Sequence, residues 1–267
     1  MLNNKKHTPK NRPKRFVLAF LAAAMLSCIA LVYTHNVPKE INAADVLYID
    51  KILQQNGIDI AALQQAAHSS FTNEIKTIRA IQSSAFTTAP KVALIPLRSP
   101  REPQNLYEAD AAYCGDRARY IDKALRYMGF NVRYASLYFN SDDRNFFSTM
   151  LTKSSLRDVD SHALVEVLTS KGWLIVDTRR HWISLTAAQQ PISLTTLHDK
   201  PLNYFEWKNN KEEGWPLLDK NYYIIYELYS RHGLFYAPYT KYIPDINWRG
   251  FIKHNLQQLT QRQANQP

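Results

Sequence analysis

The sequence lacks compositional features that are typical of several large protein classes. It contains only seven glycines, without a regular spacing, which excludes a collagen and a glycine-rich linker protein. Its first 15 residues contain no acidic side chain and six basic ones. Without that segment 27 basic and 23 acidic residues remain, so the net charge falls from +10 to +4. The basic excess is therefore local, and we expect no nucleic acid as a partner.

An uncharged apolar run covers residues 16–33. Its 18 residues are just enough to cross roughly 30 Å of bilayer hydrocarbon as a helix. Six positive charges precede the run, so we expect residues 1–15 in the cytoplasm, a single-pass anchor over 16–35 in the cytoplasmic (inner) membrane, and the rest in the periplasm or outside the cell. A cleaved signal peptide is the alternative, but no small-x-small site is obvious after Tyr33. A lipoprotein site at Cys28 fits poorly because apolar residues follow it.

Composition and periodicity divide the remaining chain. Residues 36–69 are expected to form a helical connector, with Asp59 as the cap of a helix that continues to about residue 82. Four prolines between residues 83 and 110 predict loop or extended chain there. A domain is expected over 70–255, followed by a polar, frayed tail over 256–267.

The chain has two cysteines, and the membrane run holds one of them, Cys28. Cys114 then has no partner within the chain, so it is either a buried apolar residue or a nucleophile. Residues 110–129 read as an amphipathic helix with Asp110 as its N-cap and Cys114 near its start. A helix N-terminus and nearby Arg117 favour a thiolate, whereas Asp116 opposes it.

A strand and a hairpin are expected after this helix. Residues 131–139 alternate as a strand does, 140–160 are polar and predict a loop, and 161–180 read as a hairpin. A turn at residues 169–172 pairs residues whose numbers sum to 341. In that register His162 is the diagonal neighbour of Asp177, within reach of its side chain.

Cys114, His162 and Asp177 together suggest nucleophilic catalysis. The histidine takes the thiol proton, the aspartate orients the imidazole, and the thiolate attacks a carbonyl carbon to form a thioester. Each of the three also has a purely structural interpretation. A metal site is a poor alternative because zinc prefers more Cys or His ligands. His181 is either a surface residue or a substrate contact.

The same residues resemble the transglutaminase-like superfamily. The resemblance rests on Cys-Gly-Asp-Arg-Ala from Cys114, on SHALVEVL around His162, and on LIVDT around Asp177, within residues 70–185. It implies an α+β fold with a papain-like core, the three residues as nucleophile, base and orienting acid, and no cofactor or metal. The larger eukaryotic crosslinking enzymes have a Trp before the nucleophile and bind calcium, whereas every Trp here follows Cys114 and no acidic cluster suggests calcium. The Arg-Gly-Gly that precedes the nucleophile in arylamine acetyltransferases is also absent.

The resemblance is closer to bacterial anchored or exported proteins, some of them tied to cell-envelope polysaccharide production. It implies a cysteine enzyme that acts on an amide or acyl bond of a peptide or glycan-linked substrate, with envelope-complex proteins as candidate further partners. The alternative is a catalytically silent module that binds peptide or glycan. The aromatic C-terminal 80 residues either pack as core and lid or form a binding wall. Hydrolysis and transfer stay open, as does the oxyanion donor besides the backbone N–H of Cys114.

Overall fold

The computed structural model describes residues 12–93, 95, 100–139, 161–200, 202–208, 218, 222–229 and 246–264. The predicted loop over 140–160 lies outside them. The helices are α1 (Arg12–Thr34), α2 (Ala43–Gln55), α3 (Ile60–Ala66), α4 (Phe71–Thr88), α5 (Pro103–Ala109), α6 (Cys114–Tyr127), α8 (Leu194–Asp199), the 3-10 helix η1 (Leu202–Tyr204) and α9 (Trp248–Ala264). The strands are β1 (Asn131–Phe139), β2 (Ser161–Thr169), β3 (Gly172–Val176) and β4 (Tyr222–Tyr226).

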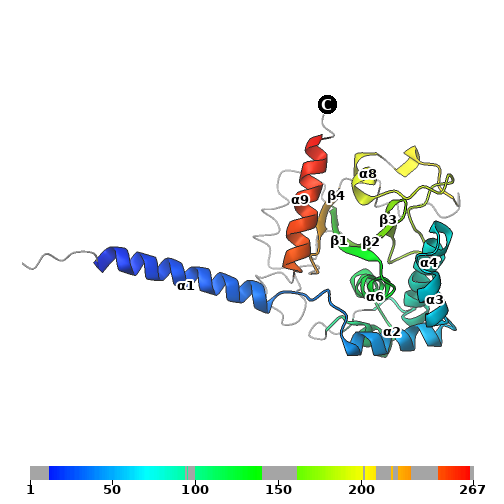
Figure 1. Ribbon diagram of the computed structural model, residues 1–267, viewed down its shortest axis with the longest axis horizontal. Coiled ribbons are helices and arrows are strands. Elements are labelled where there is room, and N and C mark those ends of the chain that lie inside the picture. The colour runs from blue at the N-terminus through cyan, green and yellow to red at the C-terminus, as the bar shows by residue number, and fades with distance from the viewer. Residues whose placement is uncertain are drawn as a thin grey trace, which may run out of the picture.

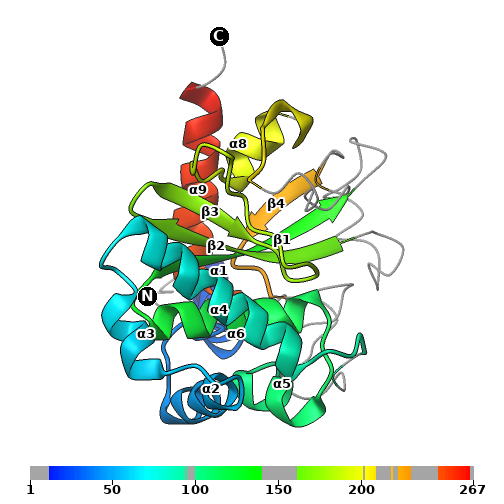
Figure 2. The same ribbon diagram turned by 90° about the vertical axis from the view of Figure 1, so that its right-hand side faces the viewer.

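The domain has an α+β architecture built on one antiparallel sheet, as predicted. The described strands pair in the order β3-β2-β1-β4, and the pairs between neighbours are antiparallel. Helices α2 to α6 lie on one side of the sheet, and α8 and α9 lie on the other side (Figures 1 and 2). The sheet thus separates the helical half that contains Cys114 from the half built by the C-terminal segment.

The predicted hairpin register is confirmed. Val165 lies opposite Val176, and Thr169 lies opposite Gly172, so paired numbers sum to 341. Gly172 has a φ of +128°, which a residue without a Cβ adopts at little cost in this tight turn. Because the side-chain period of a strand is two, a slip of one residue would move every side chain of β3 to the other face. The register therefore fixes where Asp177 leaves the sheet.

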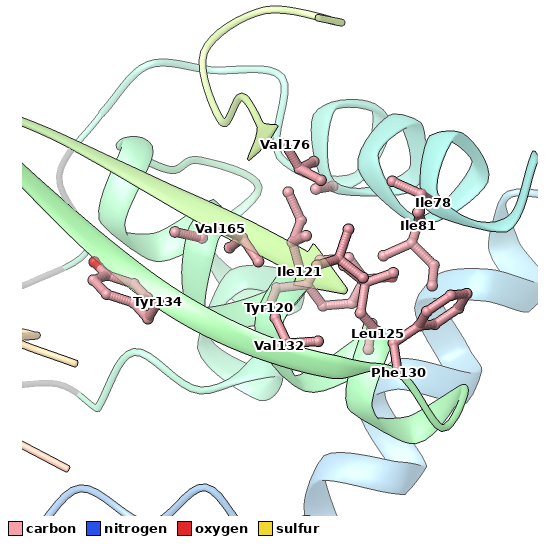
Figure 3. Close-up of a cluster of buried hydrophobic side chains, with 14 of the residues drawn as sticks. Ile78, Ile81, Tyr120, Ile121, Leu125, Phe130, Val132, Tyr134, Val165 and Val176 are labelled. Carbon is pink, nitrogen blue, oxygen red and sulfur yellow. The ribbon is translucent and has the colours of Figure 1, made fainter. Parts of the chain in front are cut away.

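The main hydrophobic core lies between the sheet and the helices that bear on it. Figure 3 shows side chains of α4, α6, β1, β2 and β3 meeting there, among them Ile81, Ile121 and Val165. The stripe predicted on the Cys114 helix is part of this core: Ala118, Ile121 and Leu125 are fully buried. Burial of such aliphatic side chains contributes about 1.5–3 kcal/mol each, so this face fixes α6 against the sheet.

A second core cluster on the opposite face contains many of the C-terminal aromatic residues. Trp182 and Trp207 meet edge to face with ring centroids 5.4 Å apart, and Tyr222 and Tyr226 are buried beside them. Tyr204, in contrast, is 61% exposed. The buried members of this cluster support core packing over a binding wall.

Several predicted boundaries in the N-terminal half are wrong. Asp59 caps a helix through the Ala62 N–H, but that helix ends at Ala66, and Ser70 then caps α4. The proline-rich stretch contains α5, because Pro103 occupies the first turn, where its missing N–H costs nothing. Asp110 follows α5 in the left-handed region with φ +50°, and the N-cap of α6 is Tyr113.

The C-terminal segment also differs from expectation. Residues 222–226, which the sequence leaves open between helix and strand, form the edge strand β4. The tail predicted to fray is helical as far as Ala264, within α9. Asn255 of α9 both donates to the Tyr226 carbonyl and accepts from the Tyr226 N–H, each at 3.1 Å, which satisfies backbone groups of this edge strand. Tertiary contacts of this kind stabilise a helix whose composition alone looks unstructured.

Helix α1 matches the predicted apolar run. Its segment Phe16–Thr34 is long and apolar enough to cross a membrane, and none of it is buried in the protein. A membrane anchor and a signal sequence share these properties.

Candidate active site

Cys114 is the first residue of α6, as the resemblance implied, and Tyr113 is the N-cap. The Asp116 carboxylate accepts a hydrogen bond from the Tyr113 N–H at 2.8 Å and pairs with the Arg101 guanidinium at 2.9 Å. The negative charge that was expected to oppose a thiolate is thus offset by Arg101 and by the helix N-terminus itself. The N–H groups and the dipole of the first helical turn then act on the Cys114 sulfur, and they favour the thiolate.

Arg117 adds a cation close to the same sulfur. Its side chain is buried and donates to the Ala89 carbonyl at 2.7 Å, and it lies over the Phe86 ring. Burial lowers the pKa of Arg117, whereas negative charge on Cys114 acts in the opposite direction. A guanidinium held this way stabilises negative charge on the sulfur.

His162 and Asp177 form the pair that the hairpin register predicted. His162 Nε2 lies 3.1 Å from Asp177 Oδ1, and Oδ1 also accepts the Arg179 N–H at 2.7 Å. Neither side chain reaches solvent to any useful extent: His162 is 1% exposed and Asp177 0%. The bond from Nε2 to a fixed carboxylate orients the ring and leaves Nδ1 to act on the nucleophile.

The electrostatics of His162 connect all three residues. Burial alone lowers the pKa of His162, but the charge and hydrogen bond of Asp177, together with a hydrogen bond and charge from Cys114, outweigh it and raise the pKa above the ordinary 6.5. The structure therefore brings the three side chains together in the order Cys, His, Asp. Cys114 is the most exposed of them, at 5%.

The comparisons with known proteins identify one family. Residues 61–178 match the family model described as the transglutaminase-like superfamily. The chain carries a transglutaminase-like domain. The match ends one residue after Asp177, so it contains the helix start, the histidine strand and the aspartate. No curated protein and no solved structure matches the chain.

A buried amide that the sequence analysis missed holds the end of the hairpin of the transglutaminase-like domain. Gln82 of α4 is 1% exposed, and its Nε2 donates to the backbone carbonyls of Asp177 and Trp182, both at 2.8 Å, and of Arg180 at 3.1 Å. These bonds close the turn that follows β3 and fix the backbone that carries the Asp177 carboxylate. The sequence signal was weak, because a glutamine in an amphipathic helix usually faces solvent.

Gln82→Leu is expected to destabilise the folded state by about 1–3 kcal/mol, because it leaves buried carbonyls without their donor. The free energy of unfolding is measured by urea titration of the detergent-solubilised chain. Gln54→Leu on the exposed face of α2 is the matched control, with an expected change within about 0.5 kcal/mol. Equal effects of the two substitutions would contradict the role assigned to Gln82.

Tyr134 is a candidate for the side-chain oxyanion donor that the sequence could not identify. This β1 residue is buried (Figure 3). Its hydroxyl lies 3.4 Å from the position that a Cβ on Gly115 would occupy. Gly115 directly follows the nucleophile in the transglutaminase-like domain. A hydroxyl beside the first turn of α6 can complement the Cys114 backbone N–H when negative charge develops on a carbonyl oxygen.

Other polar residues of this region have local roles. Gln104 donates to Glu108 at 2.8 Å, and the Asn105 side chain accepts the Glu102 N–H at 3.2 Å, so both serve α5. His181 is exposed and stacks on Phe86 with ring centroids 4.5 Å apart. Within the described ranges, no group of three or more His, Cys, Asp or Glu side chains is arranged to hold a metal ion.

Proposed function

We propose that this protein is a cysteine enzyme that acts on an amide or acyl bond through a thioester intermediate. The observation that carries the proposal is a buried histidine that lies 3.1 Å from a buried aspartate, beside a cysteine at a helix N-terminus that contributes to raising the pKa of that histidine. Cys114 is the nucleophile, His162 the general base and acid, and Asp177 the group that orients the imidazole and stabilises its protonated form. The nucleophile acts as a thiolate while the imidazole is protonated, and Arg117 stabilises the negative charge of the thiolate.

The reaction is written as two acyl transfers. The Cys114 thiolate attacks the carbonyl carbon of the substrate, and the negative oxygen is stabilised by the Cys114 N–H. The carbon–nitrogen or carbon–oxygen bond then breaks, and the leaving group departs with the proton held by His162. Water, or an amine of an acceptor, gives its proton to His162 and cleaves the thioester. The product is an acid in the first case and a new amide in the second.

We further propose that α1 anchors this domain in the cytoplasmic membrane, with residues 1–15 in the cytoplasm and the domain on the other side. The apolar side chains of α1 support this, since Phe16, Leu18 and Phe20 are each more than 70% exposed in the protein and need an apolar environment. The six basic residues before α1 favour that orientation. A peptide or glycan-linked envelope substrate, with envelope-complex proteins as partners, fits this location.

Acylation by p-nitrophenyl acetate tests the proposed chemistry. In a Cys28→Ala background, Cys114 is the remaining thiol, and we expect an acetyl adduct on the peptide that contains it, detected by mass spectrometry. Adding Cys114→Ala is expected to abolish that adduct. Release of the acetyl group to water or to added glycine ethyl ester then separates hydrolysis from transfer.

An unchanged adduct yield after Cys114→Ala would place the reaction at another residue and overturn the proposal. Lack of any acetylation of the folded protein would favour the binding module instead. Circular dichroism of the variant serves as the folding control, because a Cys to Ala change removes a single buried atom of the side chain.

A further inference from the structure

Helix α9 leaves three aliphatic side chains exposed and buries two polar ones. The face packed against the domain carries Phe251, which packs against a core cluster, and also His254 and Gln258, which are 4% and 7% exposed. The outer face carries Ile252, Leu256 and Leu259, which are 55–58% exposed and recur at the spacing of one helical stripe. A surface helix in water has the opposite arrangement, so the outer face of α9 is suited to an apolar environment.

The start of α9 is joined to the end of α1. Ile246 N–H donates to the His35 carbonyl at 3.3 Å, and Val37 N–H donates to the Ile246 carbonyl at 3.1 Å. The N–H of Trp248, the first residue of α9, donates to the Asn36 side chain at 3.2 Å. Since α1 ends at Thr34, this bonded segment begins at the very next residue, His35.

Buried ionic contacts make this junction part of the domain. Lys39 pairs with Glu227, which is fully buried just after β4. The Arg119 guanidinium on α6 donates to the Pro38 carbonyl at 2.9 Å, and Asn247 donates to the Val37 carbonyl at 2.8 Å. The chain that leaves α1 is thus held by α6, by the segment after β4 and by the approach to α9, which fixes the direction in which α1 leaves the domain.

The resulting arrangement places α9 beside the exit of α1. Figure 1 shows α1 leaving the domain on the side where α9 lies, and it shows α9 running across the direction of α1 rather than along it. The surface of a bilayer that α1 crosses is perpendicular to α1, and it is therefore roughly parallel to α9.

We propose that α9 lies in the membrane interface with Ile252, Leu256 and Leu259 inserted among the lipid chains. The inference rests on the proposed α1 anchor. Arg249 and Lys253 flank the stripe and are exposed, so they can reach anionic headgroups. The domain is then held at two places, and its active site keeps a fixed orientation to the membrane surface.

Fluorescence of single-cysteine NBD labels in the full chain, reconstituted in phosphatidylcholine–phosphatidylglycerol vesicles, tests the proposal. One sample carries the label at Leu256→Cys in a Cys28→Ala, Cys114→Ala background. A second carries it at the native Cys28 of α1, with Cys114→Ala. A third carries it at Leu47→Cys, again as the single cysteine. Leu47 is 51% exposed on α2, and α2 lies away from α9 in both views (Figures 1 and 2).

We expect blue-shifted emission and quenching by lipids brominated at carbons 6 and 7 for the labels at positions 28 and 256, and neither for the label at 47. Interfacial helices insert about 5–10 Å, which matches that bromine depth. Adding Ile252→Asp and Leu259→Asp should remove the quenching at 256, whereas Gln257→Glu should not.

The remaining outcomes each overturn the inference in a distinguishable way. Quenching at 28 with water-like emission at 256 leaves the anchor intact and shows that α9 is not in lipid. A blue shift at 256 without quenching shows that protein, such as a second copy, covers the stripe. An unquenched label at 28 contradicts the anchor itself, and the interfacial site falls with it.

Discussion

Alkylation of Cys114 by iodoacetamide at pH 6 is expected to slow by about 10²-fold when His162 is replaced by Gln. In the folded protein the raised pKa of His162 keeps the imidazole protonated above its ordinary titration range, so that it stabilises a thiolate. Without that partner only the helix N-terminus and Arg117 favour the anion, so the thiolate fraction falls toward that of an ordinary cysteine, which titrates near 8.5 and is only about 0.3% thiolate at pH 6. The rate is measured by mass spectrometry in a Cys28→Ala background.

The pH dependence has a definite sign. Because the folded pKa of His162 lies above the unfolded 6.5, the stability contributed by its charged form is fully present below pH 6.5 and is lost as the pH rises through the folded value. Asp177→Asn removes the negative charge that raises the pKa of His162, whereas the burial that lowers this pKa remains. The pKa of His162 should therefore fall. The thiolate should then require a higher pH.

The matched control is His181→Gln, which removes an exposed histidine in the same turn region. It should leave the alkylation rate of Cys114 within about twofold, in line with the small effect of surface substitutions. If His181→Gln slowed the reaction as much as His162→Gln, the effect would come from a general change in the turn. An unchanged rate in His162→Gln would show that the histidine does not act on the sulfur.

The sequence predicted the central elements of the transglutaminase-like domain because local patterns determine them. The hairpin turn and the alternation of β2 and β3 determined the pairing that brings His162 near Asp177. The stripe on α6 and its position after Tyr113 placed Cys114 at a helix start, although Asp110 was wrongly taken as its cap. The family resemblance is confirmed by the match over residues 61–178.

What the sequence could not show depends on contacts between distant segments. Gln82 lies 95 residues before its partner Asp177, and no periodicity connects them. Tyr134 reads as an ordinary strand residue until the packing of β1 on α6 brings its hydroxyl near Gly115. Residues 256–264 read as a polar tail although they belong to α9. In this helix His254 and Gln258 are buried, whereas Leu256 and Leu259 are exposed. Patterning arguments assume the reverse.

Glu102→Gln is expected to destabilise the folded protein by about 3 kcal/mol at pH 7. Glu102, the N-cap of α5, accepts two hydrogen bonds from the Arg119 guanidinium at 3.0 and 3.2 Å and pairs with Lys123 at 2.7 Å. Lys123 is itself buried and pairs with Asp45 of α2 at 2.5 Å. Glutamine keeps the shape of Glu102 but leaves two buried cations of the nucleophile helix with one carboxylate fewer, and such losses are costly.

The pKa of Glu102 gives this effect a pH signature. Burial raises the pKa, but the charges of Arg119 and Lys123 outweigh it and lower the pKa to about 2, below the ordinary 4.5. The carboxylate therefore contributes stability that is present above pH 4.5 and lost as the pH falls toward 2. The difference between wild type and Glu102→Gln, measured by urea unfolding in detergent, should shrink over that range.

Asp110→Asn is the matched control for this substitution. Asp110 pairs with Lys91 at 2.7 Å, but both side chains are more than half exposed, and asparagine tolerates the left-handed backbone at this position. Exposed ion pairs contribute about 0–1 kcal/mol, so the control should be nearly neutral at pH 7. If the two substitutions had equal costs, or if the cost of Glu102→Gln did not change between pH 7 and pH 3, the buried network would not be what holds α6 against α2 and α5. A large, pH-dependent cost for Glu102→Gln alone would show that the helix carrying Cys114 is fixed from its buried, charged side as well as by its apolar stripe.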